Sequence, residues 1–389
     1  MLSGAALADA MRDSRRRTLA AVADLSDAQW QVPMQPGVNP IAWELAHIAW
    51  FGEFWVLRGP HHVDAHGFVQ AARPPRHAGP DALFDSARLA HAARWTEPMP
   101  ARAEVLRMLD AQLAACLDAL PEGDDDARLY AHRLALFHED MHGEAFAWLR
   151  AALGYSAPSG LSSPMRPDAS HVLQMPAGEA HIGWPAARRG FAFDNECRGH
   201  VLNLPAFEID AAPLSNRQFL AFVEAGGYDD PAFWPGDAGT WRLAQDRHAP
   251  ERWRRDAHGG WQQRWFDRWL PLDADAPLIH VNAYEAEAYC RWAGRRLPRA
   301  AEWEHAATNA DAFRWGASVW EWTADAFSPY AGFEPGPYRD YSAPWFGDHR
   351  ELRGGAFATS PRLHDRRYRN FFRPERCDVF AGFRTAAPR

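Results

Sequence analysis

The sequence predicts a two-domain protein in which a helical bundle is followed by an irregular α+β domain. Hydrophobic residues at helical spacing fill residues 1–154 and become scarce afterwards. Pro, Ser and Gly dominate residues 155–170, as is typical of a linker. At 389 residues the chain is long enough for two hydrophobic cores. We therefore expect a bundle over 1–154, a linker over 155–170 and a second domain over 171–389.

Composition and charge narrow the class of protein. Apolar residues make up 47% of the chain and charged residues 24%, which is ordinary for a soluble globular protein. A net charge of -8, with no basic stripe, argues against a nucleic-acid partner. The chain has no run of 18 apolar residues and no apolar signal-peptide core near its start, so we expect no membrane partner. The four cysteines are far apart, which favours free thiols and a cytoplasmic location.

The bundle can be predicted helix by helix. The second helix is expected to have Asn39 as its N-cap and Pro40 as its first residue. The last helix should follow the acidic cluster at 124–126, which suits a helix N-terminus, and stop at Gly154. Between the second and third helices we expect a polar loop over 59–80. The predicted helices of this half are 4–25, 39–58, 81–95, 100–120 and 125–153.

Two histidines lie four residues apart in the last of these helices. Residues at this spacing share one helix face, so His138 and His142 should present their imidazoles to the same point. An isolated His-x-x-x-His pair is more often two satisfied histidines than a metal site. Apolar neighbours indicate burial here, however, and a metal can satisfy several buried histidines at once. His47, in the strongly apolar second helix, is the best candidate for a third ligand.

The second half is predicted to contain helices at 215–226 and 282–293 among short aromatic strands and turn-rich loops. It carries, in order, FDNE (193–196), PLSN (213–216), GRRLP (294–298), EWE (302–304), RGG (353–355) and GFR (382–384). Together these motifs resemble the formylglycine-generating-enzyme (sulfatase-modifying factor) fold, a C-type-lectin-like domain. Formylglycine-forming members use a closely spaced cysteine pair near the C-terminus. Because only Cys377 lies there, we do not expect that chemistry.

A histidine-bearing, DinB-like four-helix bundle in front of this fold is similar to the sulfoxide-synthase family of ergothioneine and ovothiol biosynthesis. The specific parts are the histidine motifs, LFDS at 83–86 and YRNFF at 368–372. The resemblance implies a non-haem Fe(II) enzyme that uses O2 to join a sulfur donor to the imidazole of histidine or of its trimethylated form, hercynine. It also implies His47, His138 and His142 as the iron ligands. From the residues alone, zinc held by three imidazoles and a water stays open.

Two departures from the family pattern concern the substrates. The ergothioneine branch commonly has Gln before the second helix histidine, where this chain has Met141, which donates no strong hydrogen bond. Where that branch often has Trp-Asp, this chain has Phe371 and Phe372. An aromatic wall can hold a trimethylammonium group by cation–π attraction, but it lacks the acid that helps to hold an amino-acid-like thiol. The resemblance therefore favours the selenoneine-synthase branch, with a selenosugar as donor, over a hercynine sulfoxide synthase with a thiol donor.

The resemblance gives roles to three further residues. Tyr338 is the candidate proton donor in the oxygen chemistry, and Arg376 and Arg88 fall near family positions that contact the donor. Each of the three has a structural role, in a loop or at the surface, as its alternative. Two other classes of protein also stay open. One is a zinc-dependent DinB-like thiol transferase that consumes no oxygen, and the other is a non-catalytic module that presents aromatic loops to a partner.

Overall fold

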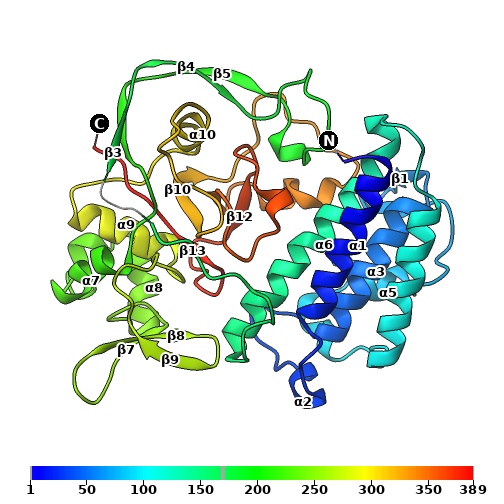
Figure 1. The fold of residues 1–389 in the computed structure, drawn as a ribbon, viewed down its shortest axis with the longest axis horizontal. Coiled ribbons are helices and arrows are strands. Elements are labelled where there is room, and N and C mark those ends of the chain that lie inside the picture. Colours follow the sequence, from blue (N-terminus) through cyan, green and yellow to red (C-terminus); the bar gives the residue numbers. More distant parts are fainter. Residues whose placement is uncertain (1, 168–170, 389) are drawn as a thin grey trace. The chain divides into compact units, whose positions relative to one another are not determined.

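The computed structural model describes residues 2–167 and 171–388, and its chain forms two compact units (Figure 1). One unit comprises Met1–Ser159 together with Arg189–Phe191, and the other comprises Gly160–Arg188 together with Ala192–Arg389. Part of the predicted linker, residues 168–170, lies outside the described residues. Among the described residues, no helix is both long enough and apolar enough to cross a membrane.

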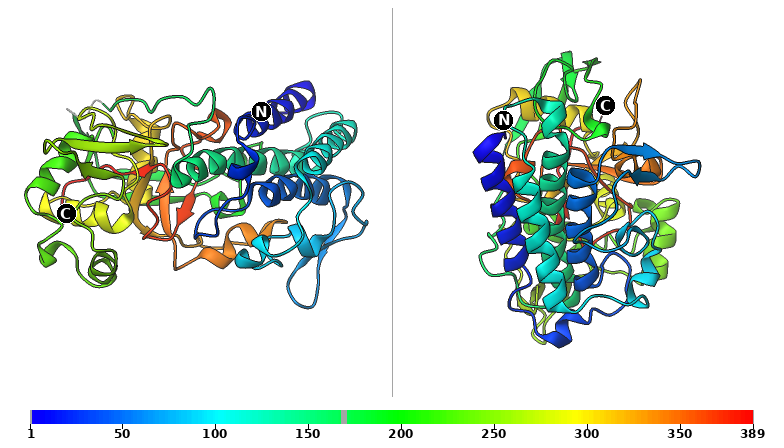
Figure 2. Two further views of the ribbon diagram at one scale, coloured as in Figure 1. Left: turned by 90° about the horizontal axis from the view of Figure 1, so that it is seen from below. Right: turned by 90° about the vertical axis from the view of Figure 1, so that its right-hand side faces the viewer.

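The N-terminal unit is a bundle built on four long helices that lie side by side (Figures 1 and 2). α3 packs against both α5 and α6, and α1 packs against α6. α3 is buried on nearly every side, as its continuous apolar sequence requires. The predicted four-helix bundle is therefore confirmed. The four helices are α1 (Gly4–Ala20), α3 (Ile41–Leu57), α5 (Arg102–Asp118) and α6 (Asp126–Leu153).

Both ends of α6 follow the signals in the sequence. The side chain of Asp125 accepts hydrogen bonds from the backbone N–H groups of Ala127 and Arg128, at 2.8 and 3.2 Å. These bonds satisfy two of the donors that a helix start leaves without an intrahelical partner. Gly154 ends the helix with a φ of 68°, a left-handed conformation that glycine adopts without steric cost. His138 and His142 consequently lie within one uninterrupted helix.

Three details predicted for the bundle are wrong. The first helix, predicted over 4–25, ends at Ala20. Asn39 is not the N-cap of α3, because Pro40 occupies that position and the Asn39 amide instead donates to Glu44 at 3.1 Å. The helix predicted over 81–95 is broken into α4 (Asp81–Phe84) and a short 3-10 helix, η1 (His91–Trp95). The side chain of Asp85 accepts the N–H of Ala87 at 2.9 Å, and such a local bond competes with helix continuation.

The remaining elements of the bundle are short. α2 (Asp27–Trp30) begins with a capping box at Ser26. The segment predicted as a loop over 59–80 contains an antiparallel hairpin of β1 (His61–Val63) and β2 (Val69–Ala71).

The C-terminal unit is an irregular α+β domain, as predicted. Its largest sheet has the strand order β12-β11-β10-β13, in which the β10–β13 pair alone is parallel. The two predicted helices are present as α7 and α9, whereas α8 and α10 were not predicted. The helices are α7 (Asn216–Glu224), α8 (Asp237–Gln245), α9 (Ala283–Trp292) and α10 (Ala300–Asn309), and the sheet strands are β10 (Trp320–Ala326), β11 (Arg350–Arg353), β12 (Asn370–Phe372) and β13 (Ala381–Gly382).

Smaller sheets and turns complete this unit. β3 pairs with β6 and β4 with β5, while β7, β8 and β9 form an antiparallel three-stranded sheet. The strands are β3 (Val172–Met175), β4 (Gly178–Ile182), β5 (His200–Leu204), β6 (Phe207–Asp210), β7 (Trp253–Arg255), β8 (Trp261–Trp265) and β9 (Arg268–Pro271). The 3-10 helices are η2 (Asp194–Glu196), η3 (Pro231–Phe233), η4 (Arg339–Tyr341), η5 (Ala343–Trp345) and η6 (Pro361–Leu363).

The motif arginines of this unit are buried and paired. Arg353 of RGG bonds Glu304 of EWE at 2.8 Å, and both side chains are fully buried. Arg384 of GFR pairs with Glu321 on β10, also in the interior. A charge inside a protein has to be paired, since removing either partner leaves the other without compensation. These paired residues of RGG, EWE and GFR therefore help to hold the fold of the domain.

Candidate metal centre

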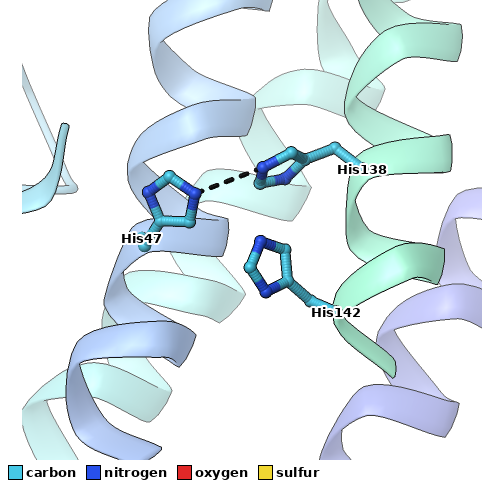
Figure 3. Close-up of side chains that lie close together, drawn as sticks. All are labelled: His47, His138 and His142. Atoms are coloured by element: carbon cyan, nitrogen blue, oxygen red, sulfur yellow. Dashed lines mark hydrogen bonds between the residues drawn. The ribbon is translucent and has the colours of Figure 1, made fainter. Parts of the chain in front are cut away.

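Three histidine side chains meet inside the N-terminal bundle (Figure 3). His47 comes from α3, and His138 and His142 come from successive turns of α6. Their potential ligand atoms all lie within 4.8 Å of one another, and the Nε2 atoms of His47 and His138 are 3.2 Å apart. Nitrogens that bind one ion at about 2.1 Å each lie roughly 3 to 4 Å apart. The three rings are thus close to the spacing that a single metal ion requires.

Hydrogen bonds fix the tautomers of two of these rings. His47 donates from Nδ1 to the carbonyl oxygen of Phe84 at 2.7 Å, so its Nε2 keeps a lone pair toward the cluster. His142 donates from Nδ1 to the Glu44 carboxylate at 2.8 Å, which likewise leaves Nε2 as the ligand atom. Ligand histidines commonly have their second nitrogen bound to a carboxylate or a carbonyl in this way.

The protonation states also suit a metal. His47 and His138 are each only 3% exposed, and this burial lowers the pKa of both imidazoles well below the ordinary value. The neighbouring His142 adds to the effect, because two positive rings would repel each other. Neutral imidazoles keep the lone pairs that a divalent metal binds. Among the described residues, these three histidines are the group of at least three potential metal ligands whose ligand atoms lie close together.

Aromatic side chains hold the ring planes in place. Trp43 stacks on His47 with ring centroids 4.9 Å apart and planes 8° from parallel. Phe51 stacks on His138 at 3.5 Å and 1°. Because packed rings cannot swing freely, this stacking restricts the directions of the two imidazoles.

The break in the predicted helix over 81–95 has a direct use at this site. α4 ends at Phe84, so its last carbonyl groups lack partners within the helix. Trp43 donates from its indole nitrogen to the carbonyl of Leu83 at 2.9 Å, and His47 donates to that of Phe84. A helix continued to residue 95 would have consumed both acceptors. The interruption therefore orients one potential ligand and the ring stacked on it.

Comparison with known proteins bears on both units. Residues 10–149 match the DinB superfamily, and residues 159–319 and 315–388 match the sulfatase-modifying factor enzyme 1-like domain. The chain is 31% identical to the hercynine oxygenase of Mycolicibacterium thermoresistibile, over 98% of this chain and 94% of that protein. It is also 31% identical to the hercynine oxygenase of Mycolicibacterium smegmatis, over 99% of both chains. This chain belongs to the hercynine oxygenase family.

The predicted membership in the sulfoxide-synthase group is thereby confirmed at the level of the family. A formylglycine-generating enzyme of Streptomyces coelicolor is 28% identical over 48% of this chain and 78% of its own length. That match is confined to part of the chain, whereas the hercynine oxygenases align from end to end.

The other predicted site residues of the bundle have defined surroundings. Met141 is half-buried on α6, directly before His142. Arg88 donates to Asp85 at 3.0 Å and to the carbonyl of Val69 at 3.2 Å. The guanidinium of Arg88 is therefore engaged in holding its own loop.

The predicted residues of the C-terminal unit fall into two groups: Phe371 and Tyr338 both lie near Tyr341, and Phe372 lies near Arg376. Phe371 stacks on Phe327 at 4.1 Å and contacts Tyr341 at 5.5 Å, and Tyr338 lies 5.8 Å from the same Tyr341 ring. The guanidinium of Arg376 lies 4.9 Å from the Phe372 ring centroid and binds both carboxylate oxygens of Asp378, at 2.9 and 2.5 Å.

Sequence reasoning missed Glu44, which contacts His142 directly. A signal was present, because an acid in a strongly apolar helix must find a buried partner. The identity of that partner depends on how α3 and α6 pack, which a single sequence does not reveal.

Proposed function

We propose that this chain is an iron- and O2-dependent enzyme that joins a selenosugar to the imidazole ring of hercynine. The observation that carries the proposal is the buried three-histidine cluster in a chain that aligns end to end with hercynine oxygenases. An alternative donor within the same reaction class is a thiol, which would make the enzyme a hercynine sulfoxide synthase.

The residues of the bundle fit the metal that this reaction needs. His47, His138 and His142 would hold the iron, which when bound supplies the redox chemistry with O2. A set of three imidazole ligands adds no carboxylate charge to the cation. Trp43 and Phe51 cover two of the rings and exclude water from those sides.

Within the C-terminal unit, we assign the proton donor and part of the substrate contacts. Tyr338 would donate a proton from its hydroxyl during the oxygen chemistry. Phe371 and Phe372 would bind the trimethylammonium group of hercynine through cation–π attraction. In the bundle, Met141 would lie beside the substrate imidazole as an apolar contact, since a thioether donates no hydrogen bond.

The charges around the two candidate donor-binding arginines support a donor without an anionic group. Arg376 already has a bidentate carboxylate partner in Asp378, and Arg88 is paired with Asp85. A carboxylate-bearing thiol would have to compete with these acids. A neutral sugar carries no such charge and does not have to displace either acid from its arginine.

A competition assay tests this proposal. Iron-loaded protein receives hercynine and O2 together with a selenosugar, a thiosugar and γ-glutamylcysteine, and the products are identified by mass spectrometry. We expect a selenium adduct as the main product and no product from His138→Ala, which lacks one of three ligands. A γ-glutamylcysteine adduct as the main product would assign the thiol reaction instead. Zinc binding without O2 consumption would indicate a DinB-like thiol transferase.

A further inference from the structure

A buried carboxylate links the two helices that carry the histidines. Glu44 lies on α3, one turn before His47, and is 1% exposed. Its Oε1 accepts the Nδ1–H of His142 at 2.8 Å, and its Oε2 accepts the side-chain amide of Asn39 at 3.1 Å. Both oxygens therefore have a donor, and one of these donors is a ring of the histidine cluster.

The contacts of Glu44 extend to the 3-10 helix η1. Asn39 uses its amide oxygen to accept a hydrogen bond from Arg94 at 2.6 Å. The Arg94 guanidinium lies 3.8 Å from the ring centroid of Trp43, the ring that stacks on His47. Arg94 thus supports His142 through Asn39 and Glu44, and it supports His47 through Trp43.

We propose that Glu44 is the positioning residue of the metal centre, held in place by Asn39 and Arg94. A carboxylate can only accept hydrogen bonds, so it obliges His142 to carry its proton on Nδ1 and to keep the Nε2 lone pair. A carboxylate partner also makes the imidazole a stronger ligand. This inference rests on the proposed function, because it takes the three histidines to be metal ligands.

A purely structural role for Glu44 is the competing explanation. In that case the carboxylate would serve only to satisfy Asn39 and to fix the start of α3. The two roles differ in what they predict for metal binding, since a structural acid can be replaced without changing the ligand strength of His142.

Glu53 offers a matched control on the same helix. It is also buried, at 0% exposure, and its two oxygens accept the backbone N–H groups of Arg76 and His77 at 2.6 and 2.8 Å. Backbone groups, rather than a histidine ring, thus hold the Glu53 carboxylate. The same Glu-to-Gln change therefore perturbs the bundle at both positions but touches a potential ligand only at Glu44.

The experiment compares Glu44→Gln, Glu53→Gln and the wild type as full-length proteins. Co(II) is the probe, with affinity measured against a competing chelator and ligand geometry read from the visible absorption of the bound ion. Thermal unfolding of the metal-free proteins reports the structural cost. We expect Glu44→Gln to weaken Co(II) binding about 10- to 100-fold and to shift the absorption bands. Glu53→Gln should bind Co(II) like the wild type even if it unfolds at a lower temperature.

A second variant keeps the inference testable if Glu44→Gln does not fold. Asn39→Ala leaves the carboxylate present but removes its support, so we expect a weaker loss of Co(II) affinity in the same direction. Unchanged affinity in the folded Glu44 and Asn39 variants, or an equal loss in Glu53→Gln, would overturn the inference. If the wild type binds Co(II) but the iron-loaded protein forms no product from hercynine, the proposed function is wrong and the inference about Glu44 stands.

Discussion

At the scale of single residues, His280 shows what burial does to an imidazole outside the metal centre. His280 lies in the interior of the C-terminal unit, where its Nδ1 donates to the carbonyl of Cys377 at 3.2 Å. Its Nε2 accepts from Arg252 at 2.9 Å. Burial, and then the positive charge of Arg252, lowers the pKa of His280 well below its ordinary value. The ring is therefore neutral in the folded protein.

This histidine should make the protein less stable in acid. In the unfolded chain His280 takes up a proton below pH about 6.5, whereas in the folded protein it stays neutral. The contribution of His280 to the free energy of unfolding is therefore fully present above that pH and is lost as the pH falls. One such group contributes a slope of about 1.4 kcal/mol per pH unit. His280→Asn removes this slope, and asparagine tolerates the φ of 65° at that position. Denaturant unfolding between pH about 5 and 7.5 measures the slope, and an unchanged slope would contradict the assignment.

Residue identities at the metal centre were predictable to the extent that they follow helical spacing. His138 and His142 share a face of one predicted helix, and the strongly apolar sequence around His47 indicated a central helix. Glu44 and Arg94 were not predictable, because their roles depend on the distance between separate helices. Asn39 was predicted as a helix cap, and tertiary packing gave its side chain a different partner.

At the scale of elements, the two acids between the α6 histidines fasten that helix to α1. Arg15 pairs with Glu139 at 2.7 Å, and both side chains are nearly inaccessible to water. Ser14 donates to Asp140 at 2.8 Å. Asp140 lies on the side of α6 opposite the two histidines and Glu139 lies between these sides, so the two contacts together fix the rotation of α6 about its axis. Packing of α1 thus helps to keep His138 and His142 directed at His47.

Removing one partner of this ion pair should be costly. Arg15→Met leaves the Glu139 carboxylate buried without compensation, which typically costs about 3 to 5 kcal/mol. The double variant Arg15→Met, Glu139→Met should recover most of that loss, since neither member of this pair is then left as an uncompensated charge. Equilibrium unfolding in denaturant measures both values. A double variant as unstable as the single one would show that the pair itself, and not the stranded charge, supplies the stability.

Helix ends with local signals were predictable, and helix interruptions were not. Asp125 starts α6 because its side chain accepts backbone N–H groups of the first turn, and Gly154 ends the helix because it adopts a left-handed conformation. The segment over 81–95 has helical periodicity but stops at Phe84, where its carbonyl groups are needed by Trp43 and His47. Hydrogen bonds donated by side chains of another helix cannot be read from the local sequence.

At the scale of the whole molecule, a metal should stabilise one unit and leave the other unchanged. An ion at 100 times its dissociation constant adds about 2.7 kcal/mol to whatever folded structure binds it. Hydrogen exchange with saturating Co(II) should therefore slow about 100-fold at amides of α3 and α6 that open only when the bundle unfolds. Amides of α9 and α10 should exchange at the same rate with and without the ion.

The variant His47→Ala serves as the control for this measurement, since it removes a ligand from α3 without touching α6. Slowing of exchange that persists in this variant, or that extends equally over both units in the wild type, would place the ion elsewhere.

The ordered series of short motifs predicted the fold of the C-terminal unit. Arginines of two of these motifs form buried ion pairs inside that unit.

The compact N-terminal unit is not one continuous stretch of chain, because Arg189–Phe191 belongs to it. The ring of Phe191 lies 5.5 Å from that of Tyr130 and 5.0 Å from that of Phe137, both on α6. Gly190 donates its N–H to Asp126 at the start of the same helix. During synthesis, the outer face of α6 must therefore wait for a segment that leaves the ribosome well after the helix itself. A nascent bundle exposes these two aromatic rings until then, and it offers a chaperone or a protease a brief opportunity to act.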